Sequence, residues 1–129
     1  MSNRIIELHN STVSTITTEG RSVIVSFSAA YIHHGNPGLD ADTGWIQPAR
    51  LEIKEASMKG EFPSANTILD GVLWVGNVEH SNFIPIPFDT LDTVRLHLEF
   101  VSGNPVTLTG KGATLEIFGE PKLIENFLP

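Results

Sequence analysis

The sequence predicts an all-β domain, and more specifically a two-layer antiparallel β-sandwich of the jelly-roll or immunoglobulin-like kind. Strand-like runs recur along the whole chain with turn residues between them, and no stretch has the period of an amphipathic helix. In most runs apolar residues alternate with polar ones, which indicates antiparallel sheets with one solvated face each. Two such sheets bury their apolar faces by packing together, so we expect about nine strands and no long helix. A closed β-barrel is the alternative.

Each predicted strand ends at residues that favour turns. Asn10–Ser11 breaks the first run, and Glu19–Gly20 follows the second, because glycine reaches positive φ without steric cost. Asp70–Gly71 is a strong signal for a two-residue hairpin, and Lys111–Gly112 separates the last two strands. The predicted strands cover residues 4–9, 12–18, 22–32, 45–56, 67–75, 83–88, 93–101, 105–109 and 113–119.

The run over residues 93–101 has the clearest alternation in the chain. Its predicted inward side chains are those of Val94, Leu96, Leu98 and Phe100, and its outward ones are those of Arg95, His97 and Glu99. The preceding run carries Pro85 and Pro87 on one face. Proline cannot donate a backbone hydrogen bond to a neighbouring strand, so we expect this strand at an edge of its sheet.

Length, charge and cysteine content exclude several classes of protein. The 129 residues suit one domain that spans residues 1–129. There is no cysteine, which excludes disulfides, thiolate metal sites and thiol nucleophiles. The net charge is −7 and the eight basic residues are scattered, so we expect no nucleic-acid partner; a basic protein partner fits the charge better. With no secretory leader and no apolar run long enough for a membrane, we expect a cytoplasmic protein.

The loop predicted over residues 33–44 is the densest in residue types that bind ligands. Two histidines and two aspartates lie in it, and an aromatic residue stands on either side. Binding residues concentrate on loops held by a rigid scaffold, and aromatic side chains often anchor a ligand or partner. The same loop residues also serve to turn the chain, and that structural interpretation stays open. The candidate binding residues are Tyr31, His33, His34, Asp40, Asp42 and Trp45.

A metal site is the alternative use of the histidines. His9, His34 and His80 lie in different parts of the chain and form a three-histidine site if the fold brings them together. Asp40 and Asp42 match only the first half of a calcium loop, because Thr43–Gly44–Trp45 breaks the pattern. No nucleophile elbow, phosphate loop or paired acid is present, so no catalytic residue and no cofactor is predicted.

The sequence therefore favours a non-enzymatic binding or interaction module over an enzyme. An inhibitor or immunity-type protein that masks a basic partner is one form of this prediction. The alternative is a metal-binding protein or enzyme that uses residues 33–45. We also expect a homodimer, because residues 12–18 are rich in β-branched residues, carry no charge, and would pair readily at an open sheet edge.

Overall fold

A computed structural model describes residues 3–35 and 42–127, and this part of the chain is all β, with ten strands and no helix. All strand pairs are antiparallel. The strands are β1 (Asn3–Glu19), β2 (Ser22–Gly35), β3 (Asp42–Ile53), β4 (Ser57–Lys59), β5 (Asn66–Val75), β6 (Val78–Ser81), β7 (Phe83–Ile86), β8 (Asp89–Phe100), β9 (Val106–Ile117) and β10 (Lys122–Phe127).

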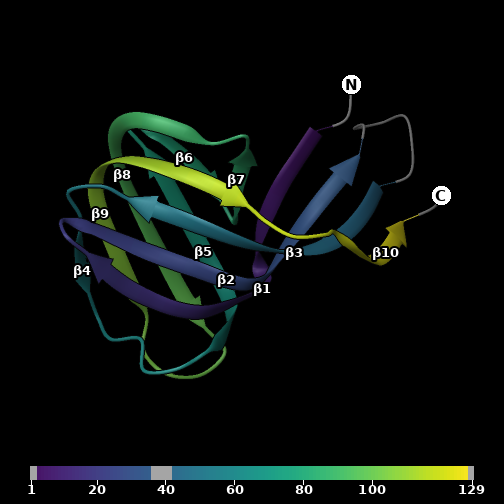
Figure 1. Ribbon diagram of the computed structural model, residues 1–129, viewed down its shortest axis with the longest axis horizontal. Helices are drawn as coiled ribbons and strands as arrows, with labels where there is room; N and C mark the ends of the chain where they lie inside the picture. Colours follow the sequence, from purple (N-terminus) through teal and green to yellow (C-terminus); the bar gives the residue numbers. More distant parts are fainter. Residues whose placement is uncertain (1–2, 36–41, 128–129) are drawn as a thin grey trace.

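Six of these strands close into a barrel, so the predicted sandwich is wrong and the alternative, a closed barrel, is confirmed. Around the barrel the order is β1, β2, β3, β9, β8 and β5, and β5 returns to β1 (Figure 1). The closing contact is the pairing of Ala49–Ile53 in β3 with Ala113–Ile117 in β9. Alternating side chains fit either architecture, because in both one face of every strand is buried.

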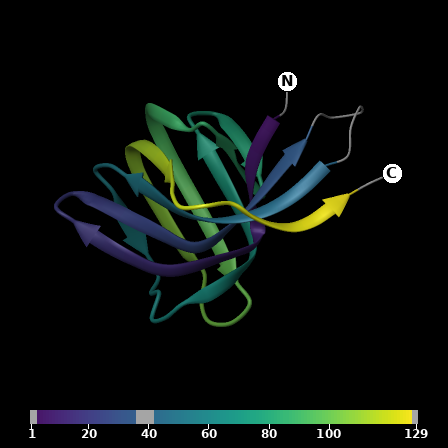
Figure 2. The same cartoon turned by 45° about the vertical axis from the view of Figure 1, so that its right-hand side comes forward.

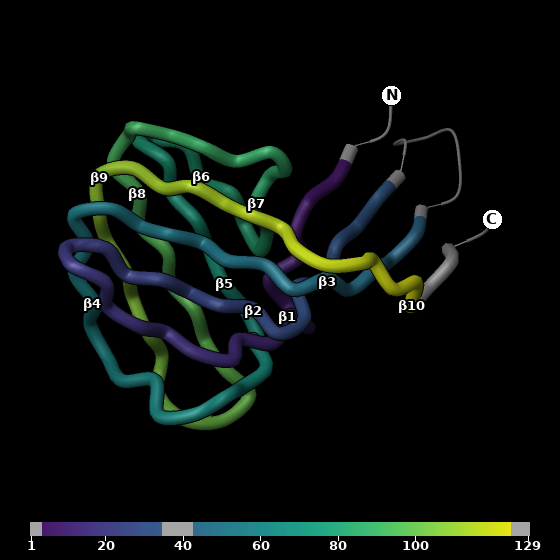
Figure 3. The backbone as a smooth tube through the Cα atoms, viewed as in Figure 1, coloured from purple at the N-terminus to yellow at the C-terminus, as the bar shows by residue number. Residues whose placement is uncertain are grey.

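A five-stranded sheet extends from one end of the barrel. It consists of the first part of β1, the second part of β2, the first part of β3, and the edge strands β7 and β10 (Figures 1 and 2). We call this the flared sheet. The smooth backbone trace in Figure 3 shows β1, β2 and β3 leaving the barrel side by side. The proline-containing strand β7 pairs only with β1 in the described chain, as its predicted edge position requires.

A bulge turns β1 from the flared sheet into the barrel. Asn10 has a φ of 75°, and the neighbouring Ser11 is fully buried. The Ser11 hydroxyl donates to the carbonyl of Glu7 at 2.6 Å and accepts the backbone N–H of Tyr31 at 2.9 Å. The buried hydroxyl therefore has both partners it needs, which removes the cost of its burial. The predicted break at Asn10–Ser11 is thus a bulge inside one long strand.

Two predicted turns also lie inside strands. Strand β5 runs straight through Asp70–Gly71, so the hairpin predicted there is wrong. Gly71 is needed for space instead: a Cβ would lie 2.9 Å from Leu8 Cδ1 and 3.1 Å from Leu98 Cδ2. Strand β9 likewise continues through Lys111–Gly112, where Gly112 adopts a φ of 103° and its carbonyl accepts the backbone N–H of Lys54.

The core fills the barrel interior and continues to the base of the flared sheet. The alternation predicted for β8 is confirmed, because Val94, Leu96, Leu98 and Phe100 are buried. Leu96 and Leu98 are completely inaccessible, and the Phe100 ring packs 5.1 Å from that of Phe62. At the base of the flared sheet Ile6 and Ile32 belong to the same apolar cluster. One face of the flared sheet is therefore an extension of the barrel core.

Candidate functional site

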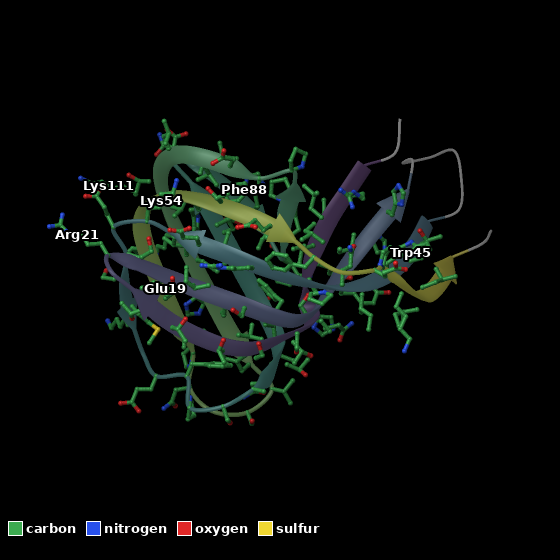
Figure 4. All side chains as sticks on the ribbon, viewed as in Figure 1. Glu19, Arg21, Trp45, Lys54, Phe88 and Lys111 are labelled. Atoms are coloured by element: carbon green, nitrogen blue, oxygen red, sulfur yellow. The ribbon has the colours of Figure 1, made fainter. Side chains whose placement is uncertain are left out.

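A pocket of 410 Å³ lies on this core-continuing face of the flared sheet, and we call it the flare pocket. One wall is Trp45, a residue of β3 next to β10, at the end of the molecule away from the β1–β2 hairpin (Figure 4). The volume of the flare pocket falls within the range of about 300–1,000 Å³ that is typical of small-molecule sites. The described residues that line it are Arg4, Ile32, His34, Trp45, Gln47 and Pro121.

Strand register explains how these residues meet. Side chains two apart on a strand share a face, which places Ile32 with His34 and Trp45 with Gln47. Across the strands, Arg4 lies directly opposite His34, and Ile32 lies directly opposite Trp45. We call Arg4 and His34 the outer row of the pocket, and Ile32 and Trp45 the inner row.

Hydrogen bonds hold the walls in place. The Trp45 indole Nε1 donates to the Thr43 hydroxyl at 2.7 Å, and that hydroxyl donates to the His34 carbonyl at 3.1 Å. Gln47 Nε2 donates to the carbonyls of Phe118 and Gly119, at 3.2 and 3.0 Å, in the connection that leads to β10. The indole and amide N–H groups therefore donate to partners in the protein. The surface that the pocket presents to a ligand is largely apolar, and these bonds fix the side chains that form it.

The exception is Arg4, whose side chain is exposed at the outer row. In the described residues the ion pairs join Arg50 to Glu19 and His97 to Glu99, and none involves Arg4. No carboxylate lines the pocket among the residues described there. A guanidinium that has no ion-pair partner among the described residues and lies beside apolar walls is a site for an anionic group, because its planar N–H donors match the geometry of such a group.

The sequence-predicted candidates divide between the two faces of the flared sheet. His34 and Trp45 line the pocket, whereas Tyr31 and His33 lie on the opposite face, with ring centroids 6.3 Å apart. There the Tyr31 ring covers Gly44, and a Cβ on Gly44 would overlap the Tyr31 hydroxyl. Tyr31 is only 6% exposed. Its contact with Gly44 packs two neighbouring strands together, which is a structural role.

The described ends of the predicted loop are strand, since β2 extends to Gly35 and β3 begins at Asp42. Asp40 lies outside the described residues. Asp42 pairs with Phe127 through the backbone, and its side chain lies outside the described part.

The three histidines proposed as metal ligands have separate surroundings. His9 Nδ1 donates to the Leu69 carbonyl at 2.7 Å, and the His80 ring meets the ring of Phe83 edge-on at 5.0 Å. His34 lines the flare pocket. Among the side chains that the structure describes, no three of His, Cys, Asp or Glu are placed to hold a metal ion.

Four lining residues escaped the sequence reasoning: Arg4, Ile32, Gln47 and Pro121. In the sequence, each of the four has the local pattern of an ordinary strand or turn residue. Their convergence depends on the pairing of β1 with β2 and of β3 with β10, which local patterns do not reveal. Strand alternation does show that Ile32 shares a face with His34, and that Gln47 shares one with Trp45, which is the one signal available beforehand.

The fold and site together define a six-stranded antiparallel barrel with an apolar pocket at one end. No family model, curated protein or solved structure matches this chain. Within the described residues, no helix is long and apolar enough to cross a membrane.

Proposed function

We propose that this protein is a non-enzymatic module that binds a small, ring-containing apolar molecule in the flare pocket. The observation that carries the proposal is the 410 Å³ pocket itself, which extends the core face of the sheet and is walled by an aromatic ring held in position. Concave, largely apolar sites with a few placed polar groups are the usual form of small-molecule sites.

Trp45 is the central wall of this site. Its ring is half-buried against the core, and the hydrogen bond from Nε1 to Thr43 sets its orientation. A flat ligand therefore meets a ring that needs no reorganisation, and such pre-organisation lowers the entropic cost of binding. We infer binding rather than catalysis because Trp45, Ile32 and Pro121 give the pocket unreactive walls, and the Trp45 indole and Gln47 amide N–H groups already have partners in the protein.

N-phenyl-1-naphthylamine tests the proposal, because this neutral aromatic probe becomes more fluorescent in apolar surroundings. We expect the wild-type protein to bind it and Trp45→Ala to bind it about tenfold more weakly, the usual cost of removing an aromatic anchor. Trp74→Ala is the matched control. Trp74 is the only other tryptophan of the chain and packs under Arg95, 5.1 Å away, outside the flare pocket.

Urea unfolding of both variants checks that each retains the fold. Equal loss of probe in the two folded variants would place the binding outside the flare pocket. Absence of probe binding by the wild-type protein would overturn the proposed function.

A further inference from the structure

The outer row of the flare pocket is polar and its inner row is apolar. Arg4 and His34 form the outer row, and Arg4 is exposed. Two residues further along the strands Ile32 is only 2% exposed and lies opposite Trp45. Two residues of a β-strand span about 7 Å, so a charged edge and an apolar floor lie one small ring system apart.

The charge at the outer row also differs from that of the molecule as a whole. The protein has a net charge of −7, yet the one formal charge among the described lining residues is the positive charge of Arg4. No described carboxylate forms an ion pair with it. The Arg4 guanidinium therefore attracts an acidic group on the ligand, and attraction of opposite charges beside an apolar surface is stronger than in bulk water.

We propose that the natural ligand is an amphiphilic organic anion: an apolar ring system seated on Ile32 and Trp45, with one carboxylate or similar acidic group bound to Arg4. This inference rests on the proposed function and adds the class of ligand. The guanidinium provides two parallel N–H donors that match a carboxylate, which Lys could not reproduce. The ring system enters first and the acidic group stays at the solvated edge, so little of its hydration is lost.

Two probes that share a ring system separate this inference from the proposed function. 1-Anilinonaphthalene-8-sulfonate carries an acidic group on the same naphthalene and phenyl groups that make up neutral N-phenyl-1-naphthylamine. We expect Arg4→Gln to weaken the sulfonate probe about fivefold, the effect of losing one exposed ion pair, and to leave the neutral probe unchanged. Added salt should weaken only the sulfonate probe.

Arg21→Gln is the matched control, because it removes the same charge at the far end of the molecule from Trp45 (Figure 4). The Arg21 side chain is exposed, and the Arg21 backbone carbonyl accepts the N–H of Ala56. We expect this variant to bind both probes like the wild type.

The outcomes are distinguishable. If the neutral probe binds at Trp45 and Arg4→Gln weakens both probes equally or neither, the acidic-ligand inference is wrong while the proposed function stands. Equal effects of Arg4→Gln and Arg21→Gln on the sulfonate probe would also overturn it, because the charge would then act through the overall field. If neither probe binds the wild-type protein, the proposed function itself fails.

Discussion

Gly71 offers the sharpest test of the barrel, because the sequence suggests a turn at a position where the structure has a closely packed strand. A Cβ at this position would lie 2.9 Å from Leu8 Cδ1, 3.1 Å from Leu98 Cδ2 and 3.2 Å from the His97 carbonyl oxygen. The first two atoms belong to side chains that are completely buried. We therefore expect Gly71→Ala to destabilise the protein.

The magnitude follows from two opposing terms. Forcing an extra methyl group into a filled core costs about 1–3 kcal/mol. Replacing glycine by alanine restricts the unfolded chain and returns about 0.4–1 kcal/mol where the backbone conformation permits alanine. The net loss should be about 1–2 kcal/mol in the free energy of unfolding, measured by urea denaturation followed by tryptophan fluorescence.

A double-mutant cycle with Leu8→Ala tests the cause. Leu8→Ala removes the nearest atom to the new methyl group, so the double variant should lose less stability than the sum of the two single variants, by about 0.5 kcal/mol or more. Gly20→Ala is the control, since Gly20 has a φ of 60° at a hairpin tip with no atom within 4 Å of a Cβ. Its cost should add to that of Leu8→Ala. A stabilising Gly71→Ala, or strict additivity in the cycle, would refute the packing argument.

Two further predictions concern the core and self-association. Leu96 is completely buried, so Leu96→Ala should lower the free energy of unfolding by about 2–5 kcal/mol in urea, and a loss below about 1 kcal/mol would contradict its position. In the described chain the Ser14–Glu19 part of β1 pairs only with β2, and we expect the wild type to scatter light as a dimer through this open edge. Thr17→Lys should scatter as a monomer, because a charge on an edge strand blocks pairing; a monomeric wild type would contradict the prediction.

The sequence by itself determined that this chain is built of strands and which residues face the core. Val94, Leu96, Leu98 and Phe100 are buried as their alternation predicts, because a period of two is a local property of an extended backbone. Pro85 placed its strand at an edge for an equally local reason, the missing backbone donor.

Only the tertiary structure shows why position 71 is a glycine. A glycine beside an aspartate favours a tight turn, and the sequence carries no sign of the close packing that Gly71 meets from Leu8 and Leu98. A glycine needed for space and a glycine needed for a turn have the same local appearance, so only the packed neighbours separate the two.

Closure and the pocket were also decided by tertiary structure alone. Sandwich and barrel share the same alternation, and only the pairing of β3 with β9 selects the barrel. The flare pocket joins Arg4 from the start of the chain to Pro121 from near its end, while His34 and Trp45 lie between them in the sequence. Side-chain alternation predicts which face of a strand a residue occupies, but the residue it meets there depends on strand order and register, which are long-range properties of the fold.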